Sequence, residues 1–172
     1  ERSYTMESEV IKNIASNATG DDPRGGWMNG RLYETVADEQ IKKGIDSAMT
    51  WANGLPDGDF KNSALSRIAG EYAREDITKA AAWATSIAGQ EGSADAIRQV
   101  AEQMGRENPQ AAIDWLVKLP EGSQDRAIGE TFRQWTETDN VAASQYLATM
   151  PASATKDNAV AGFVRQLDRE DP

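Results

Sequence analysis

The sequence predicts an all-α protein, an α-α superhelix (solenoid) of about five antiparallel helix hairpins with about ten helices. Three observations predict this class. The chain is rich in Ala and poor in β-branched residues, which favours helix over strand. Apolar side chains recur every 31–32 residues. An Asp or Asn suited to begin a helix recurs in step with them.

An aromatic column marks the repeat most clearly. Its members are 32, 32 and 31 residues apart: Trp51, Trp83, Trp115 and Tyr146. A second column recurs in step with it and consists of Tyr72, Met104, Trp135 and Leu167. Stacked aromatic rings can grip sugars or bases, but recurrence at the repeat length favours packing between hairpins. We therefore interpret all eight residues as structural repeat positions.

Each repeat is expected to hold two helices. Asn108 is a preferred N-cap and Pro109 suits the first helical position, so a helix begins there. It is expected to run to about Lys118, before Pro120 ends it. A second helix is expected from about Ser123 to Thr136. The same pattern gives repeats over 44–75, 76–107, 108–138 and 139–170.

The first helix of each repeat has a wide apolar face. On a helical wheel begun at Pro109, the apolar arc spans about 160°, against roughly 100° for a helix packed on one neighbour. Trp115 lies on one flank of this arc. The pattern therefore predicts that the Trp is wedged between consecutive hairpins.

The two ends of the chain carry weaker versions of the repeat. Residues 1–43 are expected to form a diverged N-terminal hairpin, interrupted by a loop over 18–26. Trp27 lies in the same region, either as an exposed anchor for a partner or, as we favour, as a cap on the array. Asp171-Pro172 matches the start of a further repeat. The chain is therefore expected to be one domain over 1–172 and a fragment of a longer protein.

Charge and composition exclude several functions. The net charge of −10 opposes binding to nucleic acid or to anionic lipid. No apolar run is long enough for direct membrane insertion. The absence of Cys and His removes the usual zinc ligands and His-based acid–base catalysis, and we expect no enzyme, metal or cofactor. The compartment stays open among bacterial envelope, secreted and cytoplasmic locations.

Clusters of acidic residues are the only candidate metal-binding or catalytic sites that the sequence offers. Asp57 and Asp59 resemble a calcium loop, but Lys61 stands where a ligand is needed, which favours a polar turn. Glu71, Glu75 and Asp76 meet at a helix junction, where a carboxylate pair could hydrolyse glycosides. Similar acids at other junctions favour capping instead. A carboxylate-based hydrolase is the least favoured alternative.

The motif Asp/Asn-Pro-x-x-Ala-x-x-Trp-x-x-x-Leu-Pro, best preserved over 108–120, resembles the α-helical-hairpin repeat superfamily of tetratricopeptide-like and HEAT-like solenoids. The period of 31–32 residues matches neither subfamily. The resemblance implies a non-enzymatic scaffold that binds a protein or peptide partner. A structural spacer or stalk in a larger envelope or secreted protein is the alternative. The variable outward positions of the first helices are the weak candidates for contact, namely Thr78, Ala82, Thr85, Gln110, Asp114 and Lys118.

Overall fold

The computed structural model describes residues 34–170, and all regular structure in this range is helical. The helices are a segment over 34–43, then α3 (Ile45–Asn53), α4 (Asp59–Glu75), α5 (Ile77–Ile87), α6 (Ser93–Glu107), α7 (Pro109–Leu116), α8 (Asp125–Thr138), α9 (Asn140–Thr149) and α10 (Ala154–Glu170). The predicted all-α class is confirmed for this part of the chain. Trp27, the loop over 18–26 and the first helix of the N-terminal hairpin lie outside the described residues.

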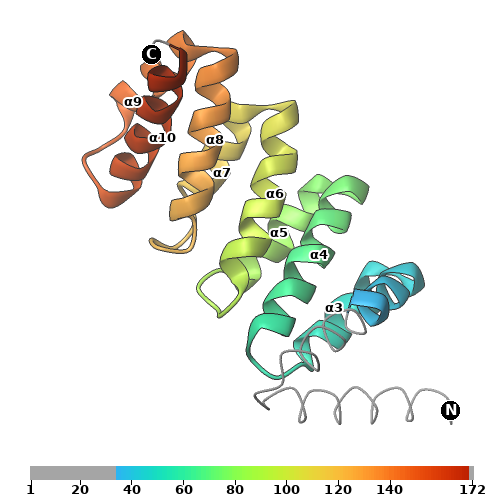
Figure 1. Cartoon of the computed structure of the whole chain (residues 1–172). Helices are drawn as coiled ribbons and strands as arrows, with labels where there is room; N and C mark the ends of the chain where they lie inside the picture. The colour runs from blue at the N-terminus through green and yellow to red at the C-terminus, as the bar shows by residue number, and fades with distance from the viewer. Residues whose placement is uncertain (1–33, 171–172) are drawn as a thin grey trace, which may run out of the picture.

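Short and long helices alternate along the chain (Figure 1). The four long helices α4, α6, α8 and α10 stand in a row, and each contacts the next. Each of the short helices α5, α7 and α9 packs against the long helices before and after it. Each of the four expected repeat spans from residue 44 onward therefore holds one short helix followed by one long helix.

Side-chain caps begin three of the short helices. The carboxylates of Asp76 and Asp139 and the side-chain oxygen of Asn108 each accept a hydrogen bond from the backbone N–H three residues on, at 2.9–3.0 Å. Pro109 occupies the first turn of α7, where its missing N–H leaves no bond unmade. The predicted helix start at Asn108-Pro109 is confirmed.

The turn between α7 and α8 is longer than expected from the sequence. The helix α7 ends at Leu116, before Lys118, and α8 begins at Asp125, after Ser123. Gly122 has φ of +90°, a left-handed conformation that residues with a side chain rarely adopt. The hydroxyl of Ser123 donates to the carbonyl of Pro120 and closes the turn at 2.6 Å. The backbone N–H groups of Lys118 and Leu119 donate to the carbonyl groups three residues earlier, so the α-helical pattern ends at Leu116, before the expected Lys118.

The core runs through the whole row of helices. The apolar positions that recur in the long helices are buried in α4, α6 and α8, for example Leu65, Ile97 and Ile128. Burial of each such side chain stabilises the fold by about 1.5–3 kcal/mol before entropy is counted. Phe132, Trp135 and Tyr146 pack ring against ring where α8 meets α9, with centroids 5.6–6.0 Å apart. The buried apolar side chains of α3 to α10 therefore form one continuous core.

Candidate binding groove

The aromatic column joins consecutive short helices. Trp51, Trp83, Trp115 and Tyr146 are all half-buried and pack against the core. The indole Nε1–H of Trp115 on α7 donates to Thr85 Oγ1 on α5 at 3.0 Å. The hydroxyl of Tyr146 on α9 donates to Asp114 Oδ1 on α7 at 2.8 Å. Trp115 and Tyr146 therefore link consecutive short helices.

The second column changes its exposure along the chain. Tyr72 and Met104 are half-buried, and Trp135 is buried. Leu167, the last member, is exposed on α10. The residue type at this position is apolar throughout, so its exposure depends on what lies beyond each helix.

Burial changes the acidity of one ring. Partial burial, together with the hydrogen bond to the Asp114 carboxylate and its negative charge, raises the pKa of Tyr146 to about 12. Both effects disfavour the tyrosinate form. Tyr146 is therefore a neutral donor at any physiological pH, which suits a structural link between α9 and α7.

Two glycines bring the backbones of α8 and α10 into contact. A Cβ atom added at Gly162 would lie 3.0 Å from the Cα atom of Gly129 and closer still to its carbonyl group. Real Cβ atoms do not approach backbone so closely, so only glycine fits at 162. This close approach also leaves a depression on the exposed face, because neither glycine carries a side chain to fill it.

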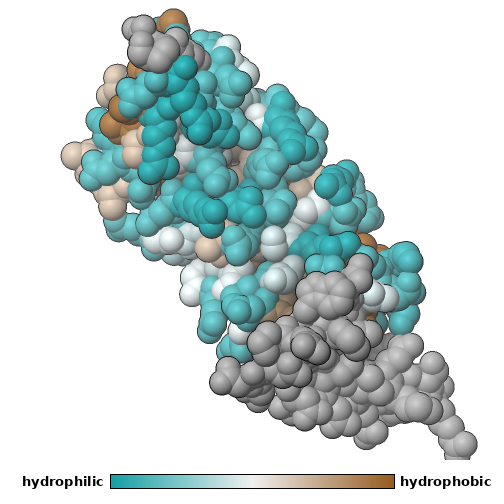
Figure 2. Space-filling model, viewed as in Figure 1, coloured by the Kyte–Doolittle hydropathy of each residue, from teal (hydrophilic) through white to brown (hydrophobic). Residues whose placement is uncertain are grey.

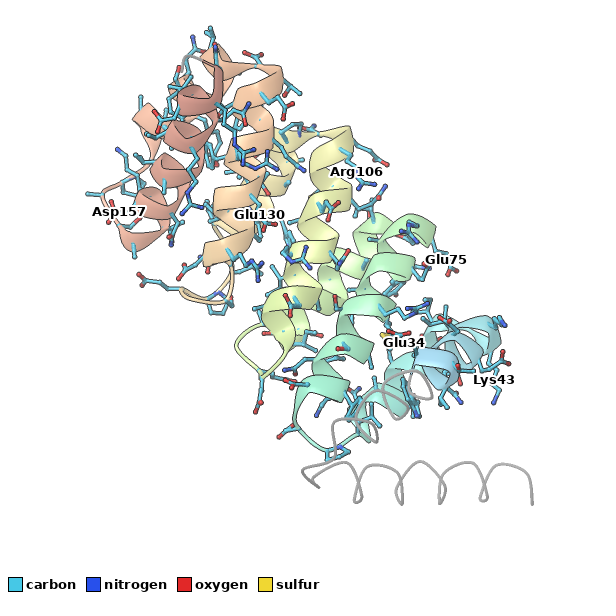
Figure 3. The ribbon with its side chains drawn as sticks, viewed as in Figure 1. Glu34, Lys43, Glu75, Arg106, Glu130 and Asp157 are labelled. Carbon is cyan, nitrogen blue, oxygen red and sulfur yellow. The ribbon has the colours of Figure 1, made fainter. Side chains whose placement is uncertain are left out.

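The depression is part of a polar groove over α6, α8 and α10. Three adjoining hollows, of about 230, 460 and 380 Å³, make up the groove. Figure 2 shows this face as mainly hydrophilic, and Glu130, labelled in Figure 3, stands on α8 within it. The charged residues that define the polar groove are Arg98, Glu102, Asp125, Arg126, Glu130, Arg133, Arg165, Asp168 and Arg169.

Arginines outnumber acids at the α8–α10 end of the polar groove. Arg126 pairs with Glu130 at 3.5 Å, and Arg133 reaches Glu137 at 4.0 Å. Arg165 and Arg169 form no ion pair with another described side chain. In a chain with a net charge of −10, this end offers free guanidinium groups, which bind carboxylates through paired N–H donors.

Two polar atoms of the polar groove have no hydrogen-bond partner. They are Arg98 Nε at the α6 end, which lies 3.6 Å from Asp95 Oδ1 as an ion pair, and Asp125 Oδ1 at the start of α8; both atoms are buried. An unsatisfied buried polar group costs about 1–3 kcal/mol. A polar ligand or water molecules in the groove would offset that cost.

Three of the five acidic residues singled out in the sequence, Asp57, Glu71 and Asp76, have local partners. Asp57 pairs with Lys61 at 2.9 Å, and Glu71 pairs with Arg74. Asp76 caps α5, and the backbone N–H of Lys79 lowers the pKa of this carboxyl, the opposite of what a general acid needs. Within residues 34–170, no three Asp or Glu side chains are grouped to hold a metal ion.

The repeat alignment contained a signal for the polar groove that the sequence analysis missed. At the position six residues after the repeating Ala of each long helix, the residues are Gly70, Glu102, Arg133 and Arg165. Core columns keep their apolar character, whereas this column changes charge from helix to helix. Variation of this kind on one face is typical of contact surfaces in repeat proteins. The variable positions named from the sequence lie on the short helices α5 and α7, whereas this column lies on the long helices.

Comparisons with known proteins give no independent assignment. No protein-family model, curated protein or solved structure matches this chain. Over residues 34–170, no helix has the length and apolar character that crossing a membrane requires.

Proposed function

We propose that this chain is an α-helical-hairpin repeat scaffold, a solenoid of the tetratricopeptide-like and HEAT-like kind, that binds a protein or peptide partner without catalysing a reaction. The stacking of equivalent positions supports the solenoid part of this proposal. The rings of Trp115 and Tyr146 each bond to the preceding short helix, at Thr85 and Asp114. A structure in which every repeat contacts only its neighbours gives an extended surface suited to a linear partner.

The polar groove is the proposed contact surface. The observation that carries this proposal is the presence of Arg165 and Arg169 beside Arg133 on one face, with no acid committed to the first two. Carboxylate side chains of a peptide would satisfy these guanidinium groups. The partner is therefore a polypeptide segment that carries Asp or Glu where it crosses α8 and α10.

Selection from a peptide library displayed on phage tests this proposal with the full chain as bait. We expect enrichment of sequences with two or more acidic residues, and weaker binding as salt is raised. Arg165→Glu should abolish binding of the selected peptides. Arg74→Glu makes the same charge change at a site outside the groove and should leave binding intact. Equal loss with both variants, or no enrichment, would contradict a groove-specific scaffold.

A structural spacer of a larger envelope or secreted protein is the second candidate. The extended row of long helices supports it, because such a row separates its two ends (Figure 1). The two candidates differ in their sensitivity to mutation. A spacer tolerates Arg165→Glu with no loss of the function of the protein that contains it, whereas a scaffold loses its partner.

A further inference from the structure

The last long helix, α10, carries an exposed apolar stripe. Val160 is 38% exposed, Val164 44% and Leu167 37%. Their spacing of four and three residues puts them on one face of the helix. Figure 2 shows apolar residues gathered at this end of the molecule, beside α9 and α10. We name these three residues the terminal face.

The same positions are buried in the earlier long helices. Leu65, Ile97 and Ile128 are equivalent to Val160, and Ala69, Ala101 and Phe132 are equivalent to Val164; all six are buried. In each case a following helix pair packs against the long helix. Within residues 34–170 no helix pair follows α10, so the terminal face is the equivalent surface and no described residue buries it.

The contact between α8 and α9 shows how a following helix buries the equivalent surface of a long helix. Phe132 and Trp135, equivalent to Val164 and Leu167, contact the ring of Tyr146. Tyr146 stands seven residues after the cap Asp139 of the covering hairpin. The complement of this surface is thus a helix hairpin with an Asp or Asn cap and an aromatic residue seven positions later.

We propose that the terminal face is a docking surface for one further helix hairpin of this repeat's own pattern. The aromatic residue of that hairpin packs on Val164 and Leu167, as Tyr146 packs on α8. This inference rests on the stacked arrangement in the proposed function and is independent of the polar groove. The occupant is defined by its pattern, and a second copy of the whole chain is a competing outcome.

A chain extended by one hairpin tests the proposal. Asp171-Pro172 has the residue types of a cap and first helical position, like Asn108-Pro109. A copy of residues 110–138 is therefore joined after Pro172, in register. Val164→Glu is then introduced into the original and the extended chains. Val141→Glu is the matched control, because Val141 is 59% exposed and its equivalents Thr78 and Gln110 stay exposed although further repeats follow.

We expect added helical signal in circular dichroism and a thermal midpoint that falls by at least about 5 °C with Val164→Glu in the extended chain, since the substitution buries a charge. The same substitution should shift the midpoint of the original chain by less than about 2 °C. Val141→Glu should have equally small effects in both.

Three results would overturn the proposal. The added residues could stay unfolded, or Val164→Glu could act equally on both chains. Alternatively, the original chain could form a dimer in analytical ultracentrifugation that Val164→Glu dissociates, which would assign the face to a second copy. Peptide binding in the polar groove is measured on the same variants, so failure of docking and failure of the scaffold proposal are distinguishable.

Discussion

Gly162 on α10 and Gly129 on α8 stand backbone against backbone. The missing side chain at Gly162 sets how closely the two helices approach, because any Cβ there would overlap the carbonyl group of Gly129. The same approach shapes the α8–α10 end of the polar groove. Stability and the proposed contact surface therefore depend on the same pair of residues.

Gly162→Ala should destabilise the protein. Alanine favours helix over glycine by about 0.5–1 kcal/mol, but the clash with α8 forces the helices apart at a cost of about 1–3 kcal/mol or more. Gly70→Ala is the matched control, since its Cβ would meet only the side-chain oxygen of Gln99 at 3.6 Å. Urea unfolding should show lower stability for the first variant and equal or higher stability for the second. Equal gains in both would contradict the close contact.

The hydrogen bond between Trp115 and Thr85 should contribute measurably to stability. Trp115→Ala should cost about 2–4 kcal/mol, near the low end for aromatic truncation, because the ring is half-buried. A double-mutant cycle with Trp115→Phe and Thr85→Val isolates the bond itself, and about 0.5–1.5 kcal/mol of coupling is expected. Coupling near zero would mean that the two short helices are not joined there.

The hydroxyl of Tyr146 should lose its proton at a higher pH than an ordinary tyrosine. Spectrophotometric titration should show one tyrosine ionising at about pH 12, against an ordinary value of 10.0. Because the folded pKa is raised, the contribution of this group to stability is complete below pH 10 and is lost as the pH rises through about 12. Asp114→Asn removes the carboxylate and should lower this midpoint. Asp157→Asn, at an exposed site on α10, should not.

Asp76 should make the stability of α5 depend on acid pH. The backbone N–H of Lys79 lowers the pKa of this carboxyl below 3.8, so its stabilising effect is present above pH 4 and disappears as the pH falls through the folded pKa. Asp76→Asn keeps a cap of the kind that Asn108 supplies. The difference between the unfolding midpoints of the two proteins should be constant above pH 4 and should shrink as the pH falls through the folded pKa of Asp76. A difference that stays constant through that fall would show that the charge of Asp76 has no part in capping.

Much of this fold could be predicted from the sequence because its strongest signals are local and periodic. The caps Asn108 and Asp139 act within one helix, and the apolar columns act between helices that are neighbours in the row. The sequence predicts the end of α7 and the start of α8 less accurately, because the backbone N–H groups of Lys118 and Leu119 bond three residues back and the Ser123 hydroxyl bonds to the Pro120 carbonyl in the turn.

The polar groove could not be predicted by aligning equivalent positions, because it is formed by residues from different positions of the pattern. Gly129 and Gly162 occupy different columns of the repeat, so comparing equivalent positions does not bring them together. The two glycines come into contact because α8 and α10 are shifted relative to each other along their length, so that positions outside the same column face each other. The charge of the groove was visible in the column that contains Arg133 and Arg165, but only after the long helices were known to share a face.

Small-angle X-ray scattering on the full chain tests the stacked arrangement most directly. A compact domain of 172 residues has a radius of gyration of about 16 Å. We predict a clearly larger value, with a distance distribution that has one early maximum and a long tail. A radius near 16 Å with a symmetric distribution would contradict a linear stack of helix hairpins.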